Sequence, residues 1–200
     1  MYKDKFDAEL EELETEYQIS YIELDQDIQI DKDCDIFTQI NSKGVRLDIF
    51  DLLNALLKPR DIQLKAMWRE AQLRLSFLDT PKMNIYILQV MSILLQNYCS
   101  SKYLYFLLPG EQKVIRNPDS SFSKTILIES SDQFKYHWNE AVEAIELASN
   151  ALGNARDFGA IKAKYVPYPS IVPVFSAIRR YTKQNGIFNR LDVSGKIRQW

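Results

Sequence analysis

A polar turn in the first quarter of the chain has the residue types that can hold a phosphate group. Residues 41–44 read Asn-Ser-Lys-Gly, and Asn and Gly adopt the positive φ angles of tight turns at little cost. The turn leads into an expected helix that begins after Asp48, and a helix N-terminus presents unpaired N–H groups and a positive dipole to an anion. The alternative is that the turn is purely structural and that Asp48 caps the helix. The candidate phosphate- or nucleotide-binding residues are Asn41, Ser42, Lys43, Gly44 and Arg46.

A second candidate is a basic face near the C-terminus. Residues 179–200 contain six bases against one acid, Asp192. Such a cluster can contact the phosphate backbone of nucleic acid, and the neighbouring rings of Tyr181 and Trp200 are of the kind on which bases stack. The alternative is an ordinary solvated helix surface. The candidate nucleic-acid-binding residues are Arg179, Arg180, Lys183, Arg190, Lys196 and Arg198.

The residue types needed for metal or nucleophilic catalysis are scarce. His137 is the only histidine, and it falls inside an expected amphipathic helix beside Trp138, where packing explains it better than catalysis. Cys34 and Cys99 are 65 positions apart, so they do not form a zinc-binding pair, and an HNH nuclease would need more histidines. Neither a G-x-x-x-x-G-K-S/T nor a G-x-G-x-x-G pattern occurs. We therefore predict no catalytic residue and no metal ligand in this chain.

Composition indicates a globular, soluble protein. Hydrophobic residues make up 46% of the 200 residues, and the net charge of -2 does not indicate a polycation. Residues 1–16 contain seven acids and lack the continuous apolar stretch that a signal peptide requires. The most apolar stretch, residues 85–95, is shorter than the roughly 20 residues that a membrane span requires. With two isolated cysteines in addition, we expect a cytoplasmic protein without membrane contact.

The elements that must position these residues are mainly helical, because the chain has only 6 Gly and 7 Pro. A strand is expected at residues 18–24, and residues 125–128 are a further extended segment. The weakly patterned stretch 103–130 is expected to be a mobile loop. Apolar spacing and capping residues predict helices over 7–16, 33–40, 48–58, 61–78, 84–98, 131–153 and 170–184. The predicted fold class is mainly α, a helical bundle with one or two strands near the N-terminus.

Residues 35–55, which include the Asn41–Gly44 turn, carry a more specific pattern. They read DIFTQINSKGVRLDIFDLLNA and resemble the signature I/V-F-x-x-I/L-N-x-x-G-x-x-L-x-x-x-D/E-L-x-x-A of the GmrS-like domain. This domain forms the N-terminal part of GmrSD-type modification-dependent restriction enzymes. Residues 165–173 are similar to a Pro-Tyr-Pro break that often opens a late helix in that family, and the expected strand at 18–24 falls where the family has one.

The resemblance implies the second half of a ParB/sulfiredoxin-like core followed by a helical subdomain. It divides the chain into residues 1–58, the remainder of the core, and residues 59–200, the helical subdomain. The family is associated with nucleoside triphosphate hydrolysis, and ParB relatives bind the nucleotide and its metal through a Glu-Asn-x-x-Arg motif with a Leu six residues after the Asn. Asn41 and Leu47 have this spacing, whereas Gly44 stands in place of the arginine. The resemblance thus extends to Asn41 but not to the whole motif.

The Asp-Gly-Gln-Gln-Arg box of the family does not occur in the chain. The leading interpretation is therefore a partial GmrS-like domain of a DNA-defence protein, inactive by itself, which contributes to a triphosphate site. The intact protein would use a nucleoside triphosphate with Mg²⁺, and DNA or an HNH-type nuclease would be its partner. The alternative is a non-catalytic helical module that binds a protein or a nucleic acid through the basic residues of 179–200.

Overall fold

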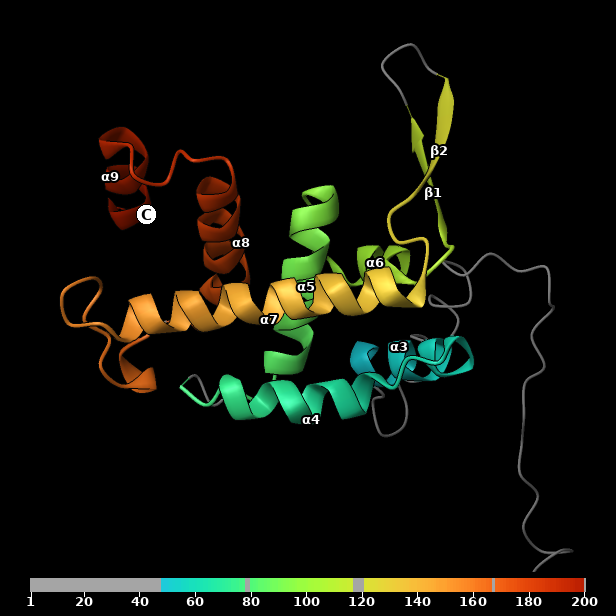
Figure 1. The fold of residues 1–200 in the computed structure, drawn as a ribbon, viewed down its shortest axis with the longest axis horizontal. Coiled ribbons are helices and arrows are strands. Elements are labelled where there is room, and N and C mark those ends of the chain that lie inside the picture. Colours follow the sequence, from blue (N-terminus) through green and yellow to red (C-terminus); the bar gives the residue numbers. More distant parts are fainter. Residues whose placement is uncertain (1–47, 78–79, 117–120, 167, 200) are drawn as a thin grey trace, which may run out of the picture. The chain divides into compact units, whose positions relative to one another are not determined.

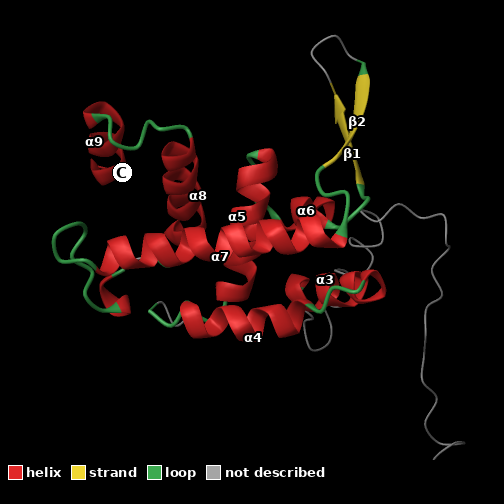
Figure 2. Cartoon of the chain, viewed as in Figure 1, coloured by secondary structure: helices red, strands yellow, loops and turns green. Residues whose placement is uncertain are grey.

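The computed structural model describes residues 48–77, 80–116, 121–166 and 168–199. Most of these residues are helical, and the strands shown in yellow in Figure 2 form one hairpin. The predicted class, mainly α with one or two strands, is confirmed. The predicted strand at 18–24, the helices at 7–16 and 33–40 and the boundary between residues 58 and 59 stay predictions, because the N-terminal part lies outside the described residues. The proposed phosphate-binding role also stays a prediction, because its residues lie outside the described part as well: Asn41, Ser42, Lys43, Gly44 and Arg46.

The first described helix begins where the sequence predicts. Helix α3 spans Ile49–Leu57, and Asp48 occupies its N-cap position in an extended conformation without a capping bond from its side chain. Pro59 ends the helix in a 3-10 turn, η2 (Lys58–Arg60), as expected for a residue without a backbone donor. Helix α4 (Leu64–Arg74) follows. A salt bridge of 2.8 Å between Lys65 Nζ and Asp51 Oδ1 joins α3 and α4.

Three helices form the core of the described part. Helix α5 spans Met83–Gln96, α7 spans Ser131–Gly153 and α8 spans Ile171–Gln184. In Figure 1, α7 crosses α5, and α8 packs against both. Apolar residues that recur every three or four positions over 131–153 predict one buried face on α7, and this is confirmed, since all of its members are buried: Phe134, Trp138, Ala141, Ile145, Ala148 and Leu152. Each large side chain buried in this way contributes about 1.5–3 kcal/mol.

Capping residues set the ends of α7 and α8. The Ser130 side chain accepts a hydrogen bond from the Gln133 N–H at 3.2 Å, so the predicted start of α7 is confirmed. Gly186 has the expected positive φ of 67° after α8. A glycine at position 153 also favours a C-cap there, and α7 does end at Gly153, but Gly153 is itself helical and Asn154 is the C-cap. A Cβ at Gly153 would lie 3.0 Å from Cε2 of Phe77, so a larger residue at this position would need the Phe77 ring to shift.

The segment 103–130, expected to be a mobile loop, contains regular structure. Helix α6 (Ser101–Leu104) and the 3-10 turn η3 (Tyr105–Leu107) precede strands β1 (Gln112–Arg116) and β2 (Phe122–Ile126). The strands pair in antiparallel fashion with Val114 opposite Lys124. At the base of the hairpin the Gly110 N–H donates to the Ile128 carbonyl at 2.8 Å. The described strands therefore lie in the middle of the chain, and the prediction for 125–128 captured only part of one strand.

One short element precedes α8 in the sequence and another follows it. The 3-10 turn η4 spans Ala163–Tyr165, and helix α9 spans Leu191–Gln199. None of the helices in the described ranges is both long enough and apolar enough to cross a membrane.

Candidate nucleic-acid interface

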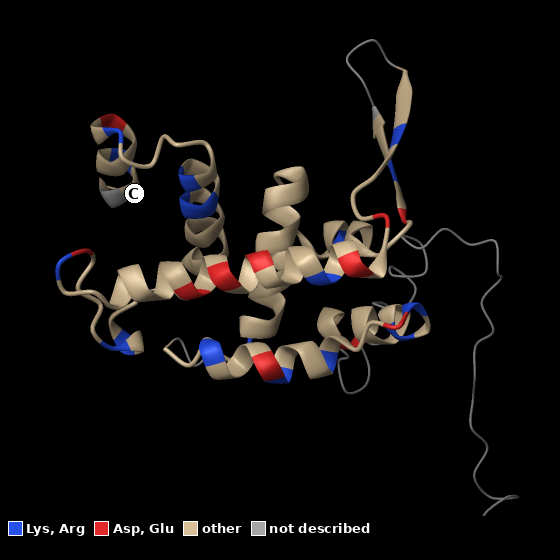
Figure 3. Ribbon diagram, viewed as in Figure 1, with Lys and Arg blue, Asp and Glu red and all other residues tan. Residues whose placement is uncertain are grey.

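Three of the six predicted basic residues come together on α8. Arg179, Arg180 and Lys183 line one side of a cavity of about 300 Å³, and residues of α7 line the other. Figure 3 shows the basic residues on α8 and acidic residues along α7. The spacing of three and four residues places these bases on neighbouring turns of one helix. The full lining is Ala144, Leu147, Arg179, Arg180, Lys183, Phe188 and Asn189.

Arg180 is held by carboxylates of α7. Its Nη2 donates to Glu140 Oε1 at 2.7 Å, and its Nη1 donates to Glu143 Oε2 at 3.3 Å. The Arg180 and Glu140 side chains are only 18% and 16% exposed. The hydrogen bond to Glu140 raises the pKa of Arg180 above its usual value, although burial acts in the opposite direction. Arg180 therefore joins α7 to α8, and an incoming anion would have to compete with two carboxylates for it.

His137 belongs to the same cluster. Its Nδ1 lies 3.4 Å from Glu140 Oε2, one turn further along α7, and its ring meets that of Tyr136 edge-on. Glu140 thus lies between the imidazole and the Arg180 guanidinium. Gln184 Nε2 also donates to Glu140 Oε1, at 3.3 Å. The carboxylate has enough partners to be a structural anchor of the α7–α8 contact.

Arg179 stacks on aromatic rings. Its guanidinium carbon is 4.8 Å from the ring centre of Phe188 and 5.5 Å from that of Phe175. Burial lowers the pKa of Arg179, and the charge of Asp157 partly offsets this effect. Arg179 also lines a second cavity of about 260 Å³, whose lining residues are Asp157, Phe158, Arg179, Phe188, Asn189, Ser194 and Ile197. Arg179, Phe188 and Asn189 therefore line both cavities.

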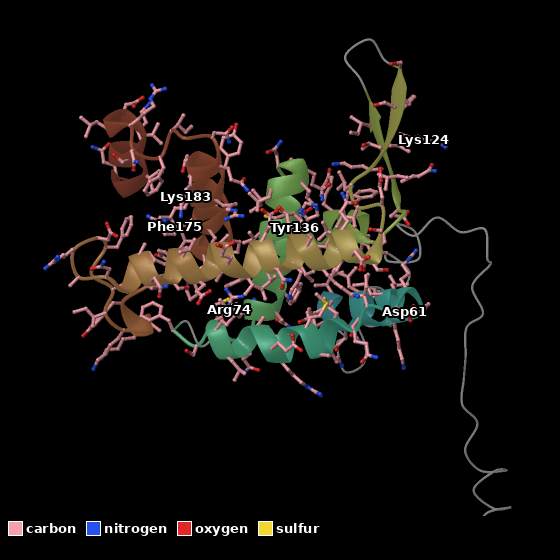
Figure 4. All side chains as sticks on the ribbon, in the orientation of Figure 1. Asp61, Arg74, Lys124, Tyr136, Phe175 and Lys183 are labelled. Carbon is pink, nitrogen blue, oxygen red and sulfur yellow. The ribbon has the colours of Figure 1, made fainter. Side chains whose placement is uncertain are left out.

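The remaining candidate bases differ in their surroundings. Lys183 is exposed at the end of α8 and has no ion pair or hydrogen bond from its side chain to another described residue. Figure 4 labels it on the same helix as Phe175. Arg190 forms an exposed ion pair with Asp192, with Nη2 3.0 Å from Oδ2. Lys196 is exposed on α9, and the Arg198 side chain lies outside the description. Lys183 is thus the most available cation at the cavity.

Within the described ranges, no group of three or more His, Cys, Asp or Glu side chains could hold a metal ion. Cys99 is a free, half-buried thiol, and burial raises its pKa.

The α7–α8 cavity combines basic and apolar lining residues, an arrangement suited to binding an anion that also has an apolar part.

Comparison with family models, with curated proteins and with solved structures gave no match.

Sequence reasoning missed the residues that complete the cavity. Leu147, Phe188 and Asn189 carry no local sign of a binding role. Glu140 and Glu143 do have a recognisable pattern in the sequence. Their spacing from His137 places all three residues on one side of α7, and in the structure that side meets the bases of α8. That pattern could have predicted an ion-pair network once the two helices were assumed to pack together.

Proposed function

We propose that the described part of this chain is a helical nucleic-acid-binding module that contacts phosphates at the cavity between α7 and α8. The observation that carries the proposal is the convergence of Arg179, Arg180 and Lys183 on one cavity. Lys183 supplies a free charge, and Arg179 supplies a planar cation against the Phe188 ring. Phosphate oxygens and a sugar or base match this mixture of cationic and apolar groups.

The distribution of charge supports a polyanionic partner. Residues 48–200 contain 20 basic and 14 acidic residues, a net charge of +6. A domain with this excess attracts nucleic acid over distances of about one Debye length, roughly 10 Å at 0.1 M salt. Arg180 adds little to that attraction, because Glu140 and Glu143 offset its charge. Contacts at the cavity should therefore involve about two phosphates, and binding should be weak and sensitive to salt.

Binding to a fluorescently labelled 20-base-pair duplex, followed by anisotropy from 20 to 200 mM salt, tests the proposal. Lys183→Gln should weaken binding and reduce the slope of log K against log salt by about 0.9, the contribution of one phosphate contact. Lys82→Gln is the matched control, because Lys82 is also an exposed lysine and lies on the turn before α5. Absence of duplex binding by the unmodified chain at 20 mM salt, or equal losses in the two variants, would contradict the proposal.

The resemblance of residues 35–55 to the GmrS-like signature supports a second function, a partial domain of a DNA-defence protein. In that protein the Asn41–Gly44 turn would border a nucleoside triphosphate bound with Mg²⁺, and an HNH-type nuclease would act as partner. Defence against DNA would place the protein in the cytoplasm, where the Cys99 thiol would stay reduced. A helical nucleic-acid-binding part is compatible with this role.

Triphosphate hydrolysis tests the second function. The protein expressed from its complete reading frame should hydrolyse ATP or GTP, and Asn41→Ala should reduce the rate at least tenfold if its amide orients the phosphates, at roughly 1.4 kcal/mol for each factor of ten. Asn54→Ala serves as the control, because its side-chain oxygen accepts a hydrogen bond from the Lys65 N–H and has a structural role. Unimpaired hydrolysis by Asn41→Ala would rule out the phosphate site at this turn.

A further inference from the structure

The β1–β2 hairpin has a charge composition unlike the rest of the chain. Its ten strand residues include Lys113, Arg116 and Lys124 and no acid. By contrast, residues 48–200 as a whole have 14 acids among 34 charged residues. The hairpin is therefore a locally cationic element, outside the cluster of bases at residues 179–200.

The strand register divides the hairpin into two faces. Residues directly opposite each other share a face and successive residues of a strand point to opposite faces, so Gln112, Val114 and Arg116 share one face with Phe122, Lys124 and Ile126. We call this the free face, and its exposed residues include Val114, Phe122, Lys124 and Ile126. Their apolar members become more exposed towards the turn, from 41% at Ile126 and 56% at Val114 to 70% at Phe122. The free face thus combines an exposed apolar stripe with a lysine at its centre.

Lys113, on the opposite face, anchors the base of the hairpin to the helices. Lys113 Nζ donates to Gln96 Oε1 of α5 at 2.7 Å and lies 5.4 Å from the ring centre of Tyr103. Gln96 Nε2 in turn donates to the Tyr103 carbonyl at 2.8 Å. Burial lowers the pKa of Lys113, which is consistent with a structural rather than a ligand-binding lysine. Figure 4 shows Lys124 on the part of the hairpin that projects from the helices.

Physical chemistry indicates that the free face needs a partner. A two-stranded hairpin is only marginally stable without packing against other elements, and leaving its apolar side chains exposed to water costs free energy that burial against a partner would recover. The lysine at its centre and the lack of any acid in either strand disfavour a cationic cover, including the free face of a second copy, which would bring Lys124 towards another Lys124. A polyanion with apolar edges satisfies both requirements.

We infer that the free face of the β1–β2 hairpin lies in a groove of duplex DNA. The major groove, about 12 Å wide, admits a two-stranded ribbon of this kind. Lys124 contacts a backbone phosphate, and Val114 and Phe122 contact sugars and the methyl groups of thymine. The inference rests on the proposed nucleic-acid-binding function and adds a second contact, on an element that sequence analysis did not assign to binding.

Two hairpin variants test this inference in the duplex-binding assay, because they should affect the salt dependence of binding differently. Lys124→Gln removes a charge, so it should lower both affinity and the salt slope, the slope by about 0.9. Phe122→Ser removes an apolar contact, so it should weaken binding about tenfold, from the apolar surface that is no longer buried, and leave the slope unchanged. The matched controls are Lys82→Gln and Leu73→Ser, because Leu73 is an 83%-exposed apolar residue on α4. Circular dichroism melting of each variant checks that the fold is retained.

The outcomes separate this inference from the function on which it rests. If Lys183→Gln weakens binding whereas Lys124→Gln and Phe122→Ser do not, the cavity binds DNA and the hairpin inference is wrong. If the unmodified chain does not bind the duplex, both are wrong. Tighter binding of a single-stranded 20-mer, or equal binding of a polyglutamate peptide, with loss in both hairpin variants would identify a different partner and overturn the assignment to duplex DNA.

Discussion

Arg180 illustrates how a single residue can carry charge without presenting it to a ligand. Its position among six bases makes it a candidate for phosphate binding, yet its guanidinium bonds to Glu140 and Glu143 on α7. Arg179, its neighbour in sequence, stacks on Phe188 instead. Lys183, one turn further on, has no such partner among the described side chains. These three candidate phosphate-binding residues of one helix thus have three different roles, because each contacts different neighbours.

Arg180→Gln should lower the free energy of unfolding by about 1.5–3 kcal/mol, since it removes charge-assisted hydrogen bonds from a mostly buried site. Arg74→Gln is a useful comparison, because the Arg74–Glu146 ion pair is more exposed, at 47% and 33%. Exposed pairs contribute about 0–1 kcal/mol, so this variant should be nearly neutral. Urea unfolding followed by circular dichroism would measure both. Equal effects in the two variants would mean that Arg180 does not anchor α7 to α8.

At the scale of single elements, capping and packing determine where each helix ends. Serine caps α7, a proline ends α3, and Gly186 follows α8 with a φ of 67°. Local residue types are sufficient to predict these three ends. The end of α7 is also predicted locally, but its packing is not, because Gly153 lies against the ring of Phe77, a residue 76 positions earlier. No local pattern contains that contact.

Two glycine substitutions should change stability in opposite directions. Gly186→Ala should destabilise the protein by about 1–2 kcal/mol, because a Cβ is strained at positive φ. Gly195→Ala should stabilise it by about 0.5–1 kcal/mol, because Gly195 lies inside α9 and an added Cβ meets no atom within 4 Å. Thermal unfolding of the two variants provides the measurement. A stabilising Gly186→Ala would contradict the turn geometry after α8.

At the scale of the whole molecule, charge is divided unevenly along the chain. Residues 1–47 carry 5 bases and 13 acids, a net charge of -8, whereas residues 48–200 carry +6. The net charge of the whole chain, -2, is the sum of these two opposite values. Nucleic-acid binding is therefore a property proposed for the described part, with the α7–α8 cavity and the hairpin as its two contacts. The duplex-binding measurements on Lys183 and Lys124 variants separate those contributions.

The sequence by itself determined the helical class, most helix ranges in the described part and the buried face of α7. Helices depend on residues three or four positions apart, so their periodicity and caps can be read locally. Tertiary structure alone decided that Arg180 meets acids 37 and 40 positions away, that Leu147 and Phe188 line a cavity with Lys183, and that a predicted loop is a hairpin. These outcomes depend on contacts between distant segments, whose free energy appears only when the helices pack together.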